Sequence, residues 1–548
     1  MTNQNPATTS LVNKPIEFAL MAERAYGDPF NEVEVDVVFA DTAGAMWRVP
    51  AFWSGDNVFR VRFAAPRSGV YTWRSACTNP DDPGLHGQTG ALTALPYTGS
   101  AELYRHGRLR VAQSRRTLEH ADGTPFLWLA DTWWMGLTQR LDWPDGFRRL
   151  TEDRVRKGFS AIQIVAGPLP DFCATIATWD PQQTNEAGWP WEQGFARINP
   201  AFYDLADLRL AFLVEQGLVP CIVGMWGYYL PFMGVERCRQ HWRYLVARYG
   251  AYPVTWCLAG EATMPTYARH GTPELDRDRE IQKAGWTEVA RYVRELDPWH
   301  NPVTVHPSWM VPARASLADA SLVDFDMLQT GHSGYTSLVP SVEAMQEAVS
   351  QEPRIPVLNS EVCYEGIMGA SGAQIQRFMF YTCMLSGACG HTYGANGIWQ
   401  FNREGDPYGD SPSGWSWGGD PWNVCMRYPG SAQMGLGRGL FERYEWWRMR
   451  PCPDRVKPRW SEDNYRAAYA AEIPGQALIC YVPHGWPVTV NGLGEQPYTA
   501  YYFDPVTGEQ VDIAQVAPAV DGVWEAPKPP SRQDWVLVVA EARSKAAT

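Results

Sequence analysis

The sequence predicts an α/β protein in which a (β/α)8 TIM barrel is flanked by two small antiparallel β-sandwich domains. Three observations lead to this fold class. The chain has 548 residues, which is too long for one ordinary core. Its middle part alternates short apolar runs with long amphipathic ones, as expected of repeated βα units. Its two ends instead alternate apolar and polar residues with a period of two, the pattern of antiparallel strands.

The N-terminal region, residues 1–104, is the first predicted β-sandwich. Residues 33–37 (VEVDV) place valines on one face of a strand and carboxylates on the other. Residues 59–63 (FRVRF) repeat this arrangement with arginines as the polar members. Gly, Pro and Asp turns separate these segments, so a small antiparallel sandwich is expected.

The middle region, residues 105–452, contains eight apolar runs that predict strands. They are FLWLAD (126–131), AIQIVAG (161–167), PCIVGM (220–225), TWCLAGE (255–261), PVTVHP (302–307), FDMLQTGH (325–332), PVLNSE (356–361) and GHTYGANGIWQ (390–400). Helical patterns such as residues 147–159 and 238–250 lie between them. A doubly wound open sheet is the alternative, but no Gly-rich phosphate motif follows an early strand, which favours the barrel.

A Pro-rich joint at residues 450–460 (RPCPDRVKPRW) leads into the last region, residues 453–548. ALICYVP, YTAYYFD and DWVLVVA are strand patterns separated by turn residues. A second small β-sandwich is therefore predicted at the C-terminal end.

Charge and composition exclude several classes of partner. The net charge is −13 and there is no long run of Lys and Arg, so neither nucleic acid nor an anionic membrane is an expected partner. No apolar run approaches ~18 residues, so no membrane span is expected. The first residues (MTNQNPATTS) lack the features of a secretory signal. The outer β-domains offer surfaces for self-association, and the sequence leaves a homo-oligomer open.

The cysteines and tryptophans give two further expectations. The 11 cysteines are scattered, odd in number and often inside apolar runs, as at Cys221, Cys257 and Cys480. This usage is typical of buried free thiols in a reducing compartment, so a cytoplasmic location is expected. The content of 26 Trp fits either a well-packed core or a cleft whose aromatic faces stack on sugar rings.

Polar and aromatic residues collect at the predicted carboxyl ends of the barrel strands, where barrel enzymes place their functional groups. These residues are Asp131, Trp133, Trp134, Glu261, His306, His332, Glu361, His391, Tyr393 and Trp399. Several of them also have a structural explanation: Asp131 as a helix N-cap, a strand-end Glu as a salt-bridge partner of a neighbouring loop, the histidines as hydrogen-bonded mouth residues, and Trp399 as a plug of the barrel.

Glu261 and Glu361 are the predicted catalytic pair. They end the fourth and seventh predicted strands, which face each other across the mouth of a closed barrel. Glycoside hydrolysis needs an acid on the leaving oxygen and a second carboxylate on the other face of the anomeric carbon. Carboxyl groups ~5–5.5 Å apart retain configuration, and a separation of ~6.5–9.5 Å inverts it. Trp256 and Tyr364 are expected to help keep the acid protonated.

Metal and serine chemistry are disfavoured by the sequence. It contains neither an HxH pair nor an HExxH spacing, and no Ser lies in a GxSxG elbow. No cofactor is therefore expected. Residues 403–423, after the eighth strand, are rich in Gly and Trp and are expected to wall the pocket, although an ordinary loop is the alternative.

Four segments, FLWLADTWW, EDRVRKGFSAIQ, PVLNSEVCYEG and GHTYGANGIWQF, resemble the apiosidase-like glycoside hydrolase family. The resemblance implies a barrel catalytic domain with a β-sandwich before it and a collagen-binding-like domain after it. It also implies an exo-acting glycosidase that removes a terminal sugar, with apiose from plant pectin side chains as the known substrate type. The family's two acids fall on Glu261 and Glu361.

The chain departs from the family at the first of these acids. The characterised type has Asp after Gly-Gly, whereas this chain has Ala259-Gly260-Glu261. The longer Glu brings the carboxyls closer together and favours retention. Related retaining barrel enzymes have Asn in the place of Gly260.

The sequence thus predicts an exo-acting, retaining glycoside hydrolase with Glu361 as nucleophile and Glu261 as acid/base. Its substrate would be a plant- or microbe-derived glycoside or oligosaccharide. The predicted substrate contacts are Asp131, Trp133, His306, His332, Tyr364, His391 and Trp399. The alternatives are a non-catalytic carbohydrate-binding barrel and an inverting glycosidase.

Overall fold

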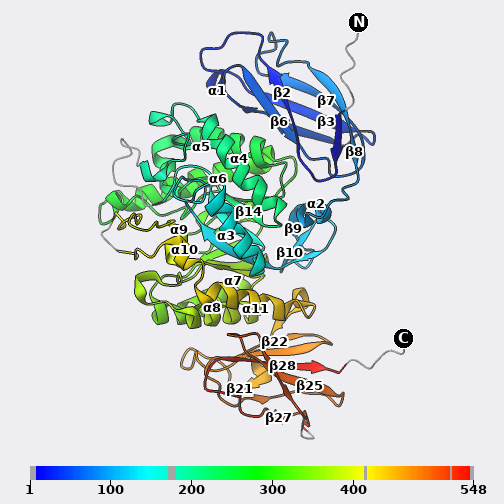
Figure 1. Ribbon diagram of the computed structural model, residues 1–548, viewed down its shortest axis with the longest axis vertical. Coiled ribbons are helices and arrows are strands. Elements are labelled where there is room, and N and C mark those ends of the chain that lie inside the picture. Colours follow the sequence, from blue (N-terminus) through cyan, green and yellow to red (C-terminus); the bar gives the residue numbers. More distant parts are fainter. Residues whose placement is uncertain (1–7, 171–180, 413–415, 519–520, 543–548) are drawn as a thin grey trace.

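The computed structural model describes residues 8–170, 181–412, 416–518 and 521–542. Figure 1 shows three parts along the long axis of the molecule: an N-terminal β-domain, a central α/β barrel and a C-terminal β-domain. The two β-domains lie at opposite ends of the barrel domain.

The N-terminal β-domain packs two sheets around an apolar core. The larger sheet has the order β1 (Thr8–Leu11), β8 (Thr89–Leu95), β7 (Gly69–Cys77), β3 (Val35–Asp41) and β4 (Met46–Pro50). The smaller has the order β2 (Ile16–Met21), β6 (Val58–Phe63) and β5 (Phe52–Trp53), and α1 (Pro29–Glu32) follows β2 in the chain.

The period-two pattern of this domain is confirmed. Val35 and Val37 of β3 are buried, and Phe39 of the same face stacks on Phe63 of β6 with ring centroids 3.9 Å apart. One detail differs from the prediction, because β1 runs parallel to β8 while the other pairs of this sheet are antiparallel.

A short connection links this domain to the barrel. It consists of α2 (Glu102–His106) and an antiparallel sheet of β9 (Leu109–Val111), β10 (Leu118–His120) and β11 (Pro125–Phe126). The sequence analysis did not predict this small sheet, whose strands are too short to show a clear alternation.

All eight predicted barrel strands are present, and every ladder between them is parallel. In chain order they are β12 (Trp128–Trp133), β13 (Ala161–Val165), β14 (Val219–Val223), β15 (Thr255–Cys257), β16 (Val303–Thr304), β17 (Asp326–Gln329), β18 (Val357–Glu361) and β19 (Gly390–Tyr393). Hydrogen bonds close the gap between β16 and β17: the Asp324 amide donates to the Val303 carbonyl (2.8 Å), and Thr304 Oγ1 donates to the Phe325 carbonyl (2.7 Å).

Helices surround the barrel, and both quoted helical patterns are confirmed. The helices are α3 (Asp145–Arg156), α4 (Pro200–Glu215), α5 (Leu230–Tyr249), α6 (Leu275–Leu296), α7 (Leu338–Ser350), α8 (Ala373–Leu385), α9 (Asn396–Trp399), α10 (Trp422–Cys425) and α11 (Pro429–Phe441). Among the described residues, none of the helices combines the length and the apolar character that crossing a membrane requires.

Several predicted strand ends need correction. β15 ends at Cys257, β16 at Thr304 and β17 at Gln329, so Glu261, His306 and His332 lie beyond the ends of their strands. The first strand continues past Asp131 to Trp133, so this aspartate lies within the strand and not at its end. The eighth strand ends at Tyr393, and Trp399 instead belongs to the short helix α9.

The C-terminal β-domain also has two sheets around its own core. The larger has the order β20 (Arg450–Pro451), β22 (Tyr469–Ile473), β23 (Ala477–Val482), β28 (Trp535–Glu541), β25 (Tyr498–Phe503) and β26 (Gln510–Ile513). The smaller consists of β21 (Val456–Lys457), β24 (Thr489–Val490) and β27 (Trp524–Glu525). The Pro-rich joint supplies β20 and β21, and a bidentate contact from Arg377 of α8 to Asp534 (2.7 Å for each bond) ties the domain to the barrel.

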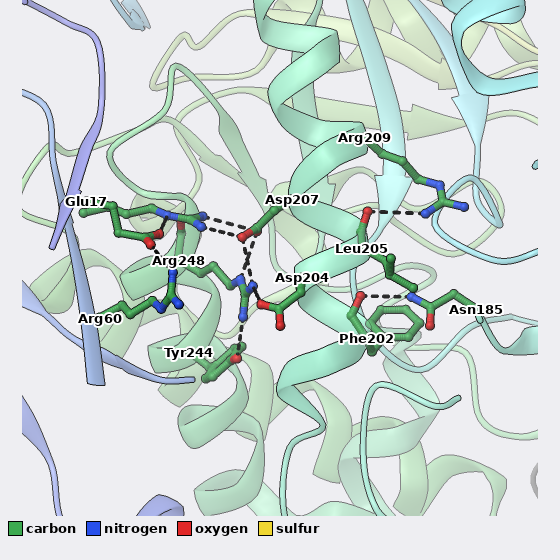
Figure 2. A network of polar contacts seen from close by, with 11 residues as sticks. Glu17, Arg60, Asn185, Phe202, Asp204, Leu205, Asp207, Arg209, Tyr244 and Arg248 are labelled. Atoms are coloured by element: carbon green, nitrogen blue, oxygen red, sulfur yellow. Dashed lines mark hydrogen bonds and ion pairs between the residues drawn. The ribbon is translucent and has the colours of Figure 1, made fainter. Parts of the chain in front are cut away.

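A buried ionic network joins the N-terminal domain to the barrel (Figure 2). Arg62 of β6 binds Asp207 of α4 and also donates to the Arg248 carbonyl (2.7 Å). Arg248 of α5 donates from Nε to Asp207 (2.9 Å) and from Nη1 to the hydroxyl of Tyr244 (2.7 Å). Glu17 of β2 accepts a further bond from Arg62 (2.8 Å). Polar side chains of β2 and β6 thus hold the N-terminal domain against α4 and α5 of the barrel domain.

Candidate active site

Glu361 is the last residue of β18, and three side chains surround its carboxylate. Oε1 accepts from Gln329 Nε2 (2.8 Å) and lies 2.9 Å from His332 Nε2. Oε2 lies 3.3 Å from His306 Nε2. The strand end therefore holds this buried carboxylate in a fixed orientation.

The environment of Glu361 favours the ionised form. Burial by itself would raise the pKa of this carboxyl, but the contacts and the charges of His306 and His332 outweigh burial and hold the pKa well below its usual range. A carboxylate that is ionised and directed by hydrogen bonds can act as a nucleophile or as a base.

Glu261 lies four residues beyond the end of β15, on a loop at the same mouth of the barrel. Its carboxylate accepts from Trp226 Nε1 at Oε2 (3.2 Å) and from Gln329 Nε2 at Oε1 (3.1 Å). Its backbone φ of +41° is in the left-handed region that is uncommon for residues other than glycine. Such backbone strain is frequent at functional sites.

The residue before this acid explains why Trp226 can reach it. A Cβ atom at Gly260 would come within 2.2 Å of the Trp226 ring. Gly260 also forms a parallel bridge with Trp226. The indole therefore occupies the space that a side chain at position 260 would need.

The two carboxyl groups face each other across one amide. Since Gln329 Nε2 binds both Oε1 atoms, these two oxygens lie no more than about 6 Å apart. The sequence predicted that Glu261 and Glu361 would face each other across the barrel mouth, and the shared amide brings them into one site.

The two carboxylates line a cavity of about 120 Å³ at the mouth of the barrel. The rest of its lining is mostly aromatic, and no Lys or Arg occurs among the lining residues that the structure describes. These residues are Trp134, Pro170, Trp226, Glu261, Met264, Tyr267, Gln329, His332, Glu361, Tyr364, Ile367, Trp399 and Trp417.

Aromatic rings form a continuous wall next to Glu361. The Tyr364 ring lies 4.7 Å from His332 and 6.1 Å from Trp399, and the Trp417 ring lies 6.5 Å from Trp399. Trp417 belongs to the Gly- and Trp-rich segment that was expected to wall the pocket; residues 413–415 of that segment lie outside the described residues.

Tyr364 and Trp134 connect this wall to the surroundings of Glu361. Trp134 Nε1 donates to the Tyr364 hydroxyl (3.1 Å). Burial and the neighbouring Glu361 carboxylate raise the pKa of Tyr364, so its hydroxyl keeps its proton and can donate a hydrogen bond.

Two predicted substrate contacts lie outside the cavity because of their position in β12. The buried Asp131 carboxylate forms an ion pair with Arg154 of α3 (2.6 Å) and accepts from Trp133 Nε1 (2.8 Å). The Trp133 ring packs edge-on against Phe147 of α3 (5.6 Å). Both side chains face the surrounding helices, so they pack within the barrel wall and do not line the cavity.

His391 and Trp256 are also placed differently from the prediction. His391 is fully buried, and its ring packs edge-on against Phe380 of α8 (5.6 Å), on the outer side of the barrel. Burial lowers its pKa to about 3, which keeps it neutral. Trp256 donates to Asp297 (2.8 Å) and does not line the cavity beside Glu261, where Trp226 is found instead.

The sequence analysis did not assign several lining residues. Gln329 lies inside the sixth predicted strand segment, just before its expected end, and Trp226 follows the third. Trp134 was noted beside Trp133 but was not selected. The position of Trp134 could have been found from the strand pattern, because every second residue of a strand lies on the same face. Trp128 points to the barrel interior, towards Thr392 (3.2 Å), and Trp134 follows it by an even number of residues.

In the site, the Glu361 carboxylate contacts two imidazoles, those of His306 and His332. The part of the chain that the structure describes holds no group of three or more His, Cys, Asp or Glu side chains arranged to bind a metal ion. The contacts of both histidines are instead directed at the Glu361 carboxylate.

Comparison with known families identifies the three parts of the chain. Residues 112–448 match the apiosidase-like catalytic domain, which is more than half of the chain. The chain belongs to the apiosidase-like family. It is therefore a glycosidase that acts on a carbohydrate substrate. Residues 12–78 match a domain of unknown function (DUF5060), and residues 459–540 match a domain described as a putative collagen-binding domain of a collagenase.

Solved structures share the fold of this apiosidase-like protein. A putative glycoside hydrolase from Bacteroides vulgatus is 16% identical with a TM-score of 0.72, covering 98% of this chain and 100% of that chain. A family 5 glycoside hydrolase from the same species is 21% identical with a TM-score of 0.68, covering 81% and 95%. A third glycoside hydrolase is 22% identical with a TM-score of 0.67, covering 80% and 98%. Among curated protein sequences, none matches the chain.

Proposed function

We propose that this protein is an exo-acting, retaining glycosidase that releases one neutral terminal sugar from a plant- or microbe-derived glycoside or oligosaccharide. Glu361 is the nucleophile and Glu261 is the general acid/base. The observation that supports this assignment most directly is the amide of Gln329, which binds both carboxylates and so limits the distance between them.

In the first step, an oxygen of Glu361 attacks the anomeric carbon and forms an ester bond to the sugar while the glycosidic C–O bond breaks. Glu261 gives its proton to the departing oxygen. The lowered pKa of Glu361 supports the role of nucleophile, because the group must be ionised to attack.

In the second step, Glu261 takes a proton from water, and the water oxygen attacks the anomeric carbon while the ester bond to Glu361 breaks. Two neighbouring carboxyl groups do not readily ionise together, which suits a pair that holds one proton between them. An upper limit of about 6 Å between the two Oε1 atoms favours retention over inversion, which needs ~6.5–9.5 Å between the carboxyls.

The size and the lining of the cavity support exo action on a neutral sugar. A volume of about 120 Å³ is far below the ~300–1,000 Å³ of pockets for drug-sized ligands, and it suits one sugar ring. Trp399, Trp417 and Tyr364 offer faces for stacking on the C–H groups of a sugar. The described lining has no Lys or Arg to pair with a carboxylate or phosphate on the substrate.

The cysteines support work in a reducing compartment, and we place the enzyme in the cytoplasm. Every cysteine among the described residues is a free thiol, and all of them except Cys452 are buried. Burial raises the pKa of thiols such as Cys238 and Cys480, which keeps them unreactive.

The test is a release assay on para-nitrophenyl furanosides and pyranosides of both anomers, with wild type and Glu361→Gln side by side. We expect wild type to cleave one glycoside and the variant to be inactive on it. Early-time NMR of that reaction should show the sugar released with the anomeric configuration of the substrate.

Three results would speak against parts of this proposal. Early release of the opposite anomer would replace retention by inversion. Activity of Glu361→Gln within a few-fold of wild type would remove the nucleophile assignment. No cleavage of any glycoside or natural oligosaccharide, together with micromolar sugar binding, would favour a binding protein.

A further inference from the structure

A second and larger cavity, of about 500 Å³, lies between the barrel and the C-terminal β-domain. Its walls include Val357 and Leu385 of the barrel domain and Tyr469 and Ala470 of β22. Val357 begins β18 and Glu361 ends it, so this cavity lies at the opposite end of the barrel from the catalytic pair.

One side of this cavity is aromatic. Trp446, Trp447 and Trp460 all line it, and Trp460 stacks on Tyr469 with ring centroids 5.7 Å apart and planes 3° apart. Trp447 is 36% exposed, so part of its indole is open to solvent. Exposed indole faces suit stacking on sugar rings.

The polar side of the cavity is cationic. Arg116, Arg354 and Arg459 line it, and none of its described lining residues is an Asp or a Glu. This is notable in a chain whose net charge is −13. A cavity with charge of one sign concentrates ligands of the opposite sign.

The arginines are incompletely paired. Arg116 forms no ion pair within the described part of the chain. Arg354 pairs with Glu352 through one terminal nitrogen (3.8 Å), but its buried Nε has no hydrogen-bond partner among the described residues. Burial and the neighbouring cations Arg354 and Arg450 lower the pKa of Arg116. Arg459 is partly neutralised by Asp454 (3.2 Å). An anionic group would therefore relieve repulsion and supply the missing acceptor.

We propose that this cavity is a second carbohydrate site, which binds a saccharide bearing a uronic acid. The sugar rings stack on Trp447 and Trp460, and Arg116 and Arg354 bind the carboxylate. The site differs in charge from the catalytic cavity, which has no Lys or Arg among its described lining residues. It therefore holds an anionic part of a glycan, whereas the catalytic cavity receives a neutral terminal sugar.

Calorimetric titration of the full chain with tetragalacturonic acid tests this site. The titration uses the Glu361→Gln variant, so that turnover does not interfere, and the fully methyl-esterified tetramer is the neutral control ligand. We expect the acid to bind at least tenfold more tightly than the ester, with an affinity that falls as salt is added.

The matched variants are Arg116→Gln/Arg354→Gln at the site and Arg279→Gln on the exposed surface of α6. We expect the double variant to weaken binding of the acid at least tenfold and the control to leave it unchanged. Trp447→Ala, at a partly exposed position, should also weaken binding and covers the case in which the double variant fails to fold.

Three outcomes would overturn the proposal: no binding of the acid at millimolar concentration, equal binding of acid and ester, or unchanged affinity in both the double variant and Trp447→Ala. Because the readout is binding, the result does not depend on the proposed function. Introduced into the protein with an intact Glu361, the same substitutions should leave cleavage of a small aryl glycoside unchanged.

Discussion

The side-chain amide of Gln329 donates hydrogen bonds from Nε2 to Oε1 of Glu361 (2.8 Å) and to Oε1 of Glu261 (3.1 Å). A single side chain thus fixes the spacing of the two carboxyl groups. Its own position is set by the end of β17, the strand next to β18. Gln329 is therefore a positioning residue as well as part of the cavity wall.

Gln329→Leu should lower kcat/KM by about 100-fold, the usual effect of removing one preorganised donor. The substitution keeps the approximate size of the side chain but removes the bond to each carboxylate. Steady-state kinetics on the glycoside found by the release assay is the measurement. Gln374→Leu, at an exposed position on α8, is the control and should keep wild-type activity. Unchanged kcat/KM in Gln329→Leu would show that the amide does not position the pair.

Glu361→Gln and Glu261→Gln should each lower kcat by about 10³ or more, as expected for groups that take part in bond making. Both substitutions are nearly isosteric, so the melting temperature should stay within a few degrees of wild type. Calorimetry and kinetics on the same samples separate loss of chemistry from loss of fold. A large loss of melting temperature with either change would point to a structural role for that carboxylate.

His332→Phe should move the acidic limb of the pH profile of kcat/KM to higher pH. His332 helps to lower the pKa of Glu361, so removing it raises that pKa and protonates the Glu361 carboxylate at a higher pH. Loss of one close hydrogen-bonding partner of the charged form corresponds to a displacement of about one pH unit. His484→Phe in the C-terminal domain is the control. An acidic limb that stays in place would mean that His332 does not set the ionisation of Glu361.

The strands were predictable from the sequence because each is a short apolar run between long helical patterns. The position of Glu361 was predictable as well, because it is the last residue of one of these apolar runs and of the strand β18. Glu261 was also expected at the barrel mouth, although β15 ends at Cys257 and a strained loop continues to the acid. That expectation came from its residue type after an apolar run, and the geometry of the loop did not enter it.

Side-chain direction was harder to predict than strand position. Asp131 and Trp133 point outward to α3, whereas their neighbour Trp134 reaches the cavity. One residue of register reverses the face of every side chain in a strand. The side chain of His391 differs from the expectation for the same reason: it packs on Phe380 of α8 and does not face the barrel interior. Gln329 was missed because an amide has no distinctive pattern in a sequence.

Gly260→Ala should lower kcat/KM by about tenfold. The added Cβ would meet the Trp226 ring at 2.2 Å and displace the indole that donates to Glu261. The effect should vanish in a Trp226→Leu background, because the ring that clashes is gone, and a double-mutant cycle measures this coupling. Gly439→Ala on α11 is the control, since an added Cβ there meets nothing within 4 Å. Additive effects of the two changes would contradict the steric argument.

Asp207→Asn should destabilise the fold by about 3 kcal/mol at neutral pH, because it leaves the buried Arg62 and Arg248 without their shared carboxylate (Figure 2). Burial alone would raise the pKa of Asp207, but the two arginines lower it, so this group stabilises the fold above its unfolded pKa of ~3.9.

That contribution is lost as the pH falls from about 4 through the lower folded pKa, so wild type and Asp207→Asn should converge in stability on acidification. Urea unfolding at a series of pH values measures both effects. Asp276→Asn, at an exposed position that pairs with Arg279, should change stability little at any pH. A difference between wild type and Asp207→Asn that stays constant down to pH 2 would show that the Asp207 carboxylate is not the group whose charge holds the N-terminal domain on the barrel.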